Sequence, residues 1–403
     1  MAKQLSTETI AIVKATVPVM EANGLAIVKR MYERMFENAS IRDLFNQSHH
    51  GETGSQPKAL AGAILAYAQN IDRLEALAPA VERIAQKHVG LNILPEHYPH
   101  VATALLGAIK DVLGDAATEE VLNAWGEAYW FLADVLIGRE RRIYGELAAA
   151  PGGWNGWRAF TVTGKQRESD IITSFTLQPV DGGRILRHRP GQYLTFWLEI
   201  PGHDPLKRNY SISCAPNDTA YRITVKREPD GIASNWLHDS VEVGAVLKVA
   251  PPTGEFFLDE AQARPVVMVS GGVGLTPMVS MLEAIAAQRP DLPAFFIHGA
   301  RNGTVHAMGR RVKELVKQNK SLTATTFYDE PAKDDVQGRD YDHAGLIGVD
   351  WLLENTPAGD ADYFLCGPKP FLRKFVSELS LAGIPASRIH YEFFGPADEI
   401  LTA

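Results

Sequence analysis

The stretch PVVMVSGGVGLTPM, residues 265–278, decides how the last third of the chain folds. In this stretch an apolar run is followed by three glycines within four positions and then by residues of helical type. A buried strand that turns through glycines into a helix is typical of an anion site, because a helix N-terminus attracts negative charge. A tight turn without a ligand explains the same glycines. The stretch therefore predicts a strand, a turn and a helix, and leaves the ligand open.

Strand-like and helical segments continue to alternate from this point to the end of the chain. The further strand candidates are AFFIHGA at 294–300, LTATTFY at 322–328 and DYFLCGP at 362–368. Alternation of this kind is the pattern of a parallel, doubly wound α/β sheet. We predict such a domain over residues 261–403.

Two other patterns precede this domain. Short segments of period two, such as QYLTFWLEI at 192–200 and YRITVKRE at 221–228, predict an antiparallel β-barrel over residues 158–260. Residues 1–147 show helical spacing in one segment after another and predict an all-α domain. The sequence PGGWNGW, with its proline and glycines, predicts a linker at 148–157. We therefore expect a multidomain chain.

Composition limits the partners and the compartment. The chain has 403 residues, a formal net charge of −8 and no cluster of Lys and Arg, which argues against nucleic acid. It has no apolar run of 18 residues and no signal-peptide pattern, so we expect no transmembrane segment and a cytoplasmic location. The two cysteines, Cys214 and Cys366, fit a reducing compartment.

Three further motifs offer groups that a flavin dinucleotide needs. RNYSIS at 208–213 places Arg208, Tyr210 and Ser211 on one strand, which provides a cation, an aromatic face and a hydroxyl. DGIASNWL at 230–237 places Gly231 and Ser234 at the start of a short helix, a second candidate anion site. YFLCGPKPF and HYEFFGP end two strands of the last domain, where such sheets bind ligands. An ordinary barrel strand and a small buried cysteine are the alternatives.

With RPGQY at 189–193, these motifs in this order resemble the ferredoxin-NADP reductase family over residues 157–403. The resemblance implies FAD, a nicotinamide nucleotide over the glycine turn, and Phe394 on the flavin face that the nicotinamide must reach. The cofactor-binding residues that it implies are Tyr193, Arg208, Asn209, Tyr210, Ser211, Gly231, Ser234, Gly272, Val273, Gly274, Leu275, Thr276, Pro277, Cys366, Phe393, Phe394, Gly395 and Pro396. Arg301 is either a grip for a 2′-phosphate or a surface residue, so the choice between NADH and NADPH stays open.

A histidine is the main candidate in the helical domain. His88 continues the apolar line Leu77, Val81 and Ile84, so it points inward. A core histidine is one interpretation, and a proximal haem ligand is the other. On the last predicted helix, Glu140 continues the apolar line that ends at Leu136, and it can hold the imidazole or pair with a neighbouring arginine.

Candidates for the opposite side of a haem come from three segments. Tyr32 lies on a predicted helix face and offers a hydroxyl, Gln56 offers an amide, and Phe45 offers a ring against the porphyrin. Each also has a plain structural interpretation, as core, surface or loop anchor. Pro57 disfavours helical backbone at Gln56, so this residue is expected at a helix start.

Taken together, the motifs YERMF, IAQKH, EHYP, AWGEAY and PGGW make the whole chain similar to the flavohaemoglobins, a globin joined to a reductase. The resemblance implies haem b, FAD and NADH or NADPH, with nitric oxide and dioxygen as substrates of a nitric oxide dioxygenase. The residues that it implies are His88 as proximal ligand, Tyr32, Tyr98 and Glu140 as catalytic residues, Lys87 and Glu392 as redox-tuning residues, and Phe45, Gln56 and Leu60 in the distal pocket.

Other functions remain open at this point. A hydroperoxide or lipid peroxide reductase, a gas sensor, and a haem-free docking module are the alternatives to a dioxygenase. A lipid in the haem pocket is also left open.

Overall fold

The structure is a computed structural model that describes residues 5–42 and 55–395. It divides into two compact units. The first contains residues 1–150 and 199–207, and the second contains residues 151–198 and 208–403. Phe45 and Pro396, two of the predicted site residues, lie outside the described residues.

The first unit is helical, as predicted. Thr118 caps the longest helix by accepting a hydrogen bond from the amide of Val121, at 3.3 Å, and Glu119 and Glu120 follow in its first turn. Residues 199–207 join this unit through Lys207, whose amine donates to the carbonyl of Leu91 at 2.9 Å. The helices are α1 (Thr7–Ala15), α2 (Val17–Phe36), α3 (Ala39–Arg42), α4 (Ser55–Gln69), α5 (Ala78–Gly90), α6 (Tyr98–Leu113) and α7 (Glu119–Ala149), with 3₁₀ turns at Leu74–Leu77, Pro95–His97 and Gly114–Ala116.

The apolar stripes of α2, α6 and α7 share one core cluster. Val28, Met31 and Tyr32 of α2 pack with Leu105 of α6 and Trp125 of α7. These positions follow the period of 3.6 seen in the sequence. Tyr32 therefore lies on the inward face of α2, as predicted.

The second unit begins with an antiparallel barrel. Its sheet has the order β4-β3-β6-β1-β2-β5. The chain just beyond β4 pairs with β5 through Ile212 and Ile223, which brings the two ends of the sheet together. The elements are β1 (Arg158–Arg167), β2 (Ile172–Pro179), β3 (Tyr193–Leu198), β4 (Leu206–Ser211), β5 (Tyr221–Lys226), α8 (Ile232–Ser240) and β6 (Val246–Val249).

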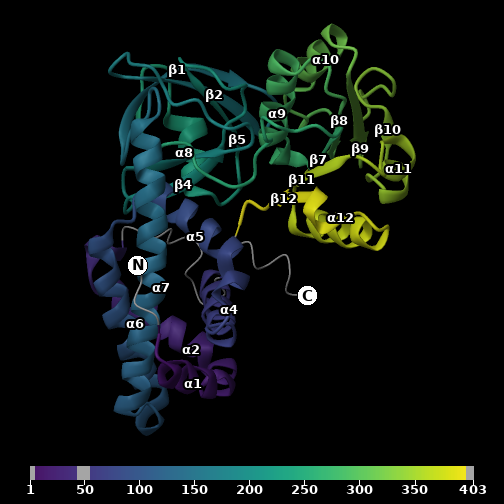
Figure 1. The fold of residues 1–403 in the computed structure, drawn as a ribbon. Helices are drawn as coiled ribbons and strands as arrows, with labels where there is room; N and C mark the ends of the chain where they lie inside the picture. Colours follow the sequence, from purple (N-terminus) through teal and green to yellow (C-terminus); the bar gives the residue numbers. More distant parts are fainter. Residues whose placement is uncertain (1–4, 43–54, 396–403) are drawn as a thin grey trace. The chain divides into compact units, whose positions relative to one another are not determined.

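A parallel sheet of order β10-β9-β8-β7-β11-β12 follows the barrel. Helices cover both of its faces, with α9 and α10 on one and α11 and α12 on the other (Figure 1). The predicted doubly wound architecture is confirmed. The elements are β7 (Val266–Gly271), the 3₁₀ turn Gly272–Gly274, α9 (Leu275–Gln288), β8 (Ala294–Ala300), α10 (Gly309–Gln318), β9 (Leu322–Tyr328), β10 (His343–Ala344), α11 (Val349–Asn355), β11 (Asp362–Cys366), α12 (Lys369–Leu381), the 3₁₀ turn Ala386–Arg388 and β12 (Ile389–Glu392).

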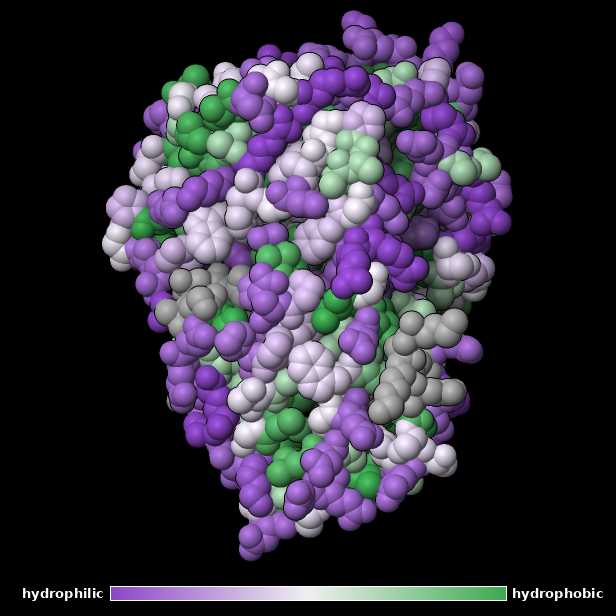
Figure 2. All heavy atoms as spheres, turned by 60° about the vertical axis from the view of Figure 1, so that its left-hand side comes forward, coloured by the Kyte–Doolittle hydropathy of each residue, from purple (hydrophilic) through white to green (hydrophobic). Residues whose placement is uncertain are grey.

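The surface is mostly polar where Figure 2 shows it, with apolar side chains scattered in small groups. Within residues 5–42 and 55–395, no single helix is long and apolar enough to cross a membrane. The bent pair α1 and α2 passes that test by length and composition only.

We expect the stability of the second unit to fall between pH 7.5 and pH 5. Burial lowers the pKa of His188 to about 4, although a backbone carbonyl and Glu283 act in the opposite direction. The unfolded chain takes up the proton near pH 6.5 and the folded chain does not, so acid favours unfolding. His188 alone should cost about 2 kcal/mol at pH 5. Urea unfolding followed by circular dichroism at both pH values measures this loss, and the His188→Gln variant should lose less. Equal losses in both proteins would contradict the assignment to His188.

Candidate functional site

His88 is held at one ring nitrogen by a buried acid. It lies in the last turn of α5, and its Nδ1 is 2.7 Å from Oε1 of Glu140 on α7. Tyr98, the first residue of α6, donates its hydroxyl to the same oxygen at 2.6 Å and lies 3.1 Å from Nδ1. Because the tyrosine proton goes to the carboxylate, Nδ1 carries a proton and also donates to Glu140. The three residues brought together are those that the sequence marked.

The alternative partner for Glu140 is not realised. Arg139 instead pairs with Glu82 of α5, with N–O distances of 2.6 and 3.0 Å. Glu140 is only 2% exposed, and its second oxygen has no hydrogen bond within the described part of the chain. Burying a carboxylate destabilises the fold unless a partner donates a hydrogen bond to it. The helix face therefore directs Glu140 to the imidazole.

The remaining nitrogen of His88 suits a haem iron. With Nδ1 protonated, Nε2 has a lone pair, and the hydrogen bonds that His88 makes within residues 5–42 and 55–395 are both at Nδ1. The same residues contain no group of three or more His, Cys, Asp or Glu side chains that could hold a bare metal ion. A single imidazole is the protein ligand that a porphyrin iron needs, because the porphyrin supplies four other nitrogens.

Tyr32 lies in the apolar core of the same unit. Its side chain is 8% exposed, and its ring lies 5.5 Å from that of Phe36. Burial raises the pKa of its phenol well above the ordinary value. The hydroxyl therefore keeps its proton and stays a hydrogen-bond donor.

The other distal candidates are placed only in part. Gln56 is the second residue of α4 and Pro57 the third, as expected from the proline. Leu60 is partly buried against the helical core. Lys87 is exposed on α5, next to His88.

Tyrosines from α7 support this group, and the sequence did not single them out. Tyr129 donates to the carbonyl of Tyr98 at 2.7 Å, and Tyr144 donates to that of Ile93 at 2.8 Å. Helical spacing places Tyr129 on the apolar line of α7 and gives no sign of its hydrogen bond. These bonds hold the start of α6 and the turn before it.

The flavin candidates lie on neighbouring strands of the barrel. Arg208 and Tyr210 fall on one face of β4 by the strand alternation, and Asn209 and Ser211 fall on the other. Burial lowers the pKa of the Arg208 guanidinium, so this cation has lost part of its hydration. An anionic pyrophosphate would offset that loss. Tyr193 on the adjacent strand β3 is partly buried. Burial and the negative charge of Glu392 both raise the pKa of its phenol.

Ser234 has a local role in the structure. Its hydroxyl accepts from the amide of Glu228 at 3.1 Å and donates to the carbonyl of Gly231 at 3.2 Å. A Cβ at Gly231 would lie 2.4 Å from this hydroxyl. The pair thus shapes the turn before α8, and its predicted anion-binding role stays a prediction.

The glycine turn lies at the point where the order of the parallel sheet reverses. Strands β8, β9 and β10 follow on one side of β7, and β11 and β12 lie on the other. Ligands of doubly wound sheets bind at the carboxyl ends of the strands at this point. Gly272 has a φ of +56°, and a Cβ on Gly274 would be 2.2 Å from the carbonyl oxygen of Cys366. The backbone is therefore closely packed at Gly274.

We expect Gly274→Ala to abolish reduction of the flavin by the nicotinamide nucleotide. The carbonyl of Cys366 is backbone in β11 and cannot move aside, so the turn must shift from the position in which we predict that it binds the nucleotide. Anaerobic flavin absorbance after mixing with NADH measures the effect. Gly359→Ala, where no atom lies within 4 Å, is the control. Wild-type rates in the Gly274 variant would contradict this placement of the nucleotide.

The last candidates lie at the ends of β11 and β12. Cys366 is fully buried, and burial raises the pKa of its thiol, so it is an unreactive small side chain. It pairs with Glu392 across the two strands. Phe393 is partly buried, whereas Phe394 is 48% exposed and is followed by Gly395. An exposed ring at a strand end is available to cover a flat ligand.

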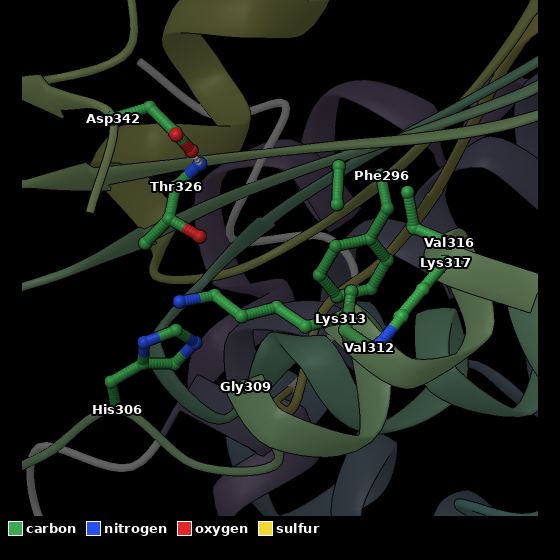
Figure 3. Close-up of a pocket in the computed structure, with 10 residues that line it drawn as sticks. Phe296, His306, Gly309, Val312, Lys313, Val316, Lys317, Thr326 and Asp342 are labelled. Atoms are coloured by element: carbon green, nitrogen blue, oxygen red, sulfur yellow. Dashed lines mark hydrogen bonds between the residues drawn. The ribbon is translucent and has the colours of Figure 1, made fainter. Parts of the chain in front are cut away.

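A cavity of about 280 Å³ lies elsewhere in this unit, between α10 and strands β8 and β9. In Figure 3 the amine of Lys313 lies between the ring of His306 and the hydroxyl of Thr326, and Lys317 points away. None of the site residues that we predict from the sequence lines this cavity. The marked residues gather at the two sites described above.

Parts of the chain match known protein families. Three family models match the chain: globin at residues 29–136, oxidoreductase FAD-binding domain at 159–258, and oxidoreductase NAD-binding domain at 268–377. The flavohemoprotein of Xylella fastidiosa (strain Temecula1) is 53% identical over the whole of both chains. That of Rhodopirellula baltica is 47% identical over 98% of this chain and 99% of its own.

Solved structures show the same similarity. Flavohemoglobin from Malassezia yamatoensis, a crystal structure with bound FAD and haem, has a TM-score of 0.87 and 29% identity over 98% of this chain and 100% of its own. The FAD/NAD-binding domain of nitric oxide dioxygenase from Vibrio cholerae has a TM-score of 0.54 and 37% identity over 59% of this chain and 99% of its own. This chain therefore belongs to the flavohemoprotein family, with a globin domain followed by the FAD-binding and NAD-binding domains of an oxidoreductase.

Proposed function

We propose that this protein is a nitric oxide dioxygenase, which uses NADH or NADPH to convert nitric oxide and dioxygen to nitrate. The observation that carries the proposal is the 2.7 Å contact between Nδ1 of His88 and buried Glu140. A carboxylate at this nitrogen makes the imidazole a stronger donor to a metal at Nε2. A further support is the 37% identity to a domain of a nitric oxide dioxygenase.

Haem b at His88 and FAD on the barrel would supply the redox chemistry that joins the nucleotide to the two gases. Glu140 keeps the proton on Nδ1 of His88, and Tyr98 orients Glu140 through its 2.6 Å hydrogen bond. Tyr32 holds a phenolic proton in an apolar core, where a hydrogen bond to dioxygen is not weakened by water. Apolar neighbours of Tyr32 keep solvent out of this region.

In the second unit, each candidate has a simple task. Arg208 would neutralise the pyrophosphate of FAD, and Tyr210 and Tyr193 would offer aromatic surfaces to the flavin. The turn at 272–274 would hold the phosphates of the nucleotide. Phe394 would cover the flavin in the absence of the nicotinamide.

A single sequential experiment tests the proposal. NADH is added without oxygen, the flavin and haem absorbance are followed, and oxygenated buffer with nitric oxide is then added. We expect reduction of the flavin, then of the haem, and one nitrate for each nitric oxide consumed. A sample that shows no Soret band after haem supplementation would overturn the proposal.

A hydroperoxide reductase is the second candidate, and the His88–Glu140 contact also favours it. Electron donation through a proximal ligand assists cleavage of an O–O bond. Hydroperoxide consumption at the same NADH concentration separates the two activities. Faster peroxide than nitric oxide turnover would favour the second candidate, and a gas-dependent change of flavin turnover without gas consumption would indicate a sensor.

A further inference from the structure

Helix α9 is fixed to the barrel by polar side chains one turn apart. Ser280 is fully buried and donates its hydroxyl to the carbonyl of Cys214 at 2.7 Å. Glu283 is 6% exposed and accepts from the amide of Ala215 at 3.0 Å. The two residues are three positions apart and so share one helix face. We call this set, completed by His188, Arg222 and Arg311, the α9 clamp.

Two arginines complete the contacts of Glu283. Arg222 of β5 donates to Oε1 at 3.0 Å, and Arg311 of α10 donates to the same oxygen at 2.9 Å. Burial alone would raise the pKa of Glu283, but Arg222, Arg311 and the Ala215 amide hold it below the ordinary value. The carboxylate is therefore ionised and joins the barrel to two helices of the nucleotide domain. Removing one partner of such a group leaves a buried charge unpaired, which is costly.

His188 completes the clamp from the barrel side. Its Nε2 lies 3.0 Å from the carbonyl of Cys214 and 3.2 Å from the hydroxyl of Ser280. A carbonyl only accepts, so Nε2 carries a proton, and burial, which lowers the pKa of His188, keeps the ring neutral. The contact thus depends on dipoles and fixed geometry rather than on charge.

The clamp joins the two candidate ligand sites by short, stiff stretches of chain. Cys214 and Ala215 lie three and four residues beyond Ser211, the last residue of the flavin strand β4. Ser280 lies six residues beyond Gly274, and these six residues belong to the helix that starts at the nucleotide turn. Any shift of α9 on the barrel therefore changes where the turn stands relative to β4.

Hydride transfer is sensitive to such a shift. The reaction needs the donor carbon of the nicotinamide and the acceptor nitrogen of the flavin to be aligned and within near-contact distance, and a misplacement of about 1 Å can cost on the order of 100-fold in rate. We propose that the α9 clamp sets the approach of the nicotinamide to the flavin, with Glu283 as the positioning residue. This inference rests on the proposed binding of FAD and the nucleotide to these sites.

The test compares Glu283→Gln with wild type under anaerobic conditions. We expect the limiting rate of flavin reduction by NADH to fall roughly 10- to 100-fold. The long-wavelength charge-transfer absorption of the nicotinamide–flavin complex should weaken, and the FAD content and the transfer of electrons from photoreduced flavin to haem should remain. A merely structural role would not change the charge-transfer band at constant FAD content.

Two further variants make the outcome decisive. Glu242→Gln removes an exposed acid whose ion-pair partner, Lys165, belongs to the same barrel domain. This variant should behave as wild type. Ser280→Ala removes the second contact without an unpaired charge and should weaken the same band, even where Glu283→Gln does not retain FAD. Unchanged rate and band in Ser280→Ala and Glu283→Gln would overturn the inference. Absence of flavin reduction in the wild type would instead overturn the proposed function.

Discussion

Glu140→Gln is expected to lower nitric oxide consumption roughly 10- to 100-fold while the fold is retained. Glutamine has the same shape, but it brings no negative charge to Nδ1 of His88. The imidazole then becomes a weaker electron donor, and haem affinity and the haem reduction potential should both change. Nitric oxide consumption and a haem titration measure the effect.

Two control variants identify the cause of this loss. Glu82→Gln breaks the ion pair with Arg139 that joins the same two helices, next to Glu140 in sequence. Partly exposed pairs of this kind contribute little, so this variant should stay near wild type. Tyr98→Phe removes one donor from Glu140 and keeps the charge, so its loss should be smaller. Equal losses in the Glu82 and Glu140 variants would show that Glu140 only holds the helices together.

The inward faces of the helices could be predicted because the helical period is local. His88 and Glu140 each continue an apolar line, so each was expected to face inward. Their contact could not be predicted from spacing, since it depends on how α5 and α7 pack across 52 positions of sequence. Three arginines next to Glu140 in sequence were equally good partners until the packing was known.

The glycine turn at 272–274 was the part of the second unit that the sequence predicted most directly. Glycines between a strand and a helix are a local signal, because glycine readily adopts the positive φ of Gly272. The close approach of Gly274 to β11 explains why a side chain is excluded there. Ser234 shows the opposite case, because its hydroxyl serves its own turn. A hydroxyl at a helix start has both options, and composition does not distinguish them.

The sequence shows that Glu283 is unusual, but it does not show which residues Glu283 contacts. An acid within the apolar helix MVSMLEAIA is visible in the sequence as an exception. Its partners Arg222 and Arg311 come from 61 positions before and 28 positions after it, on different layers of the fold. Only the packed structure shows that Glu283 connects α9 to β5 and α10.

Tyr32→Phe is the second variant from which we expect a large effect. The ring and its packing stay, and only the hydroxyl is lost, so haem binding and flavin reduction should continue. Nitric oxide dioxygenation should fall by about 100-fold, because a donor to developing negative charge in a dry site is lost. Stopped-flow mixing of the oxygenated protein with nitric oxide measures the rate directly.

Tyr67→Phe is the matched control for this loss. Tyr67 is also a buried tyrosine of the helical core, and its hydroxyl donates to the carbonyl of Ala128 at 2.7 Å. Losing that bond should lower the free energy of unfolding by about 1 kcal/mol. It removes no group that we propose to contact dioxygen or nitric oxide. Faster dissociation of dioxygen in Tyr32→Phe alone would locate the hydroxyl beside the gas. Equal nitric oxide rates in Tyr32→Phe and wild type would remove Tyr32 from the reaction and leave it as a core residue.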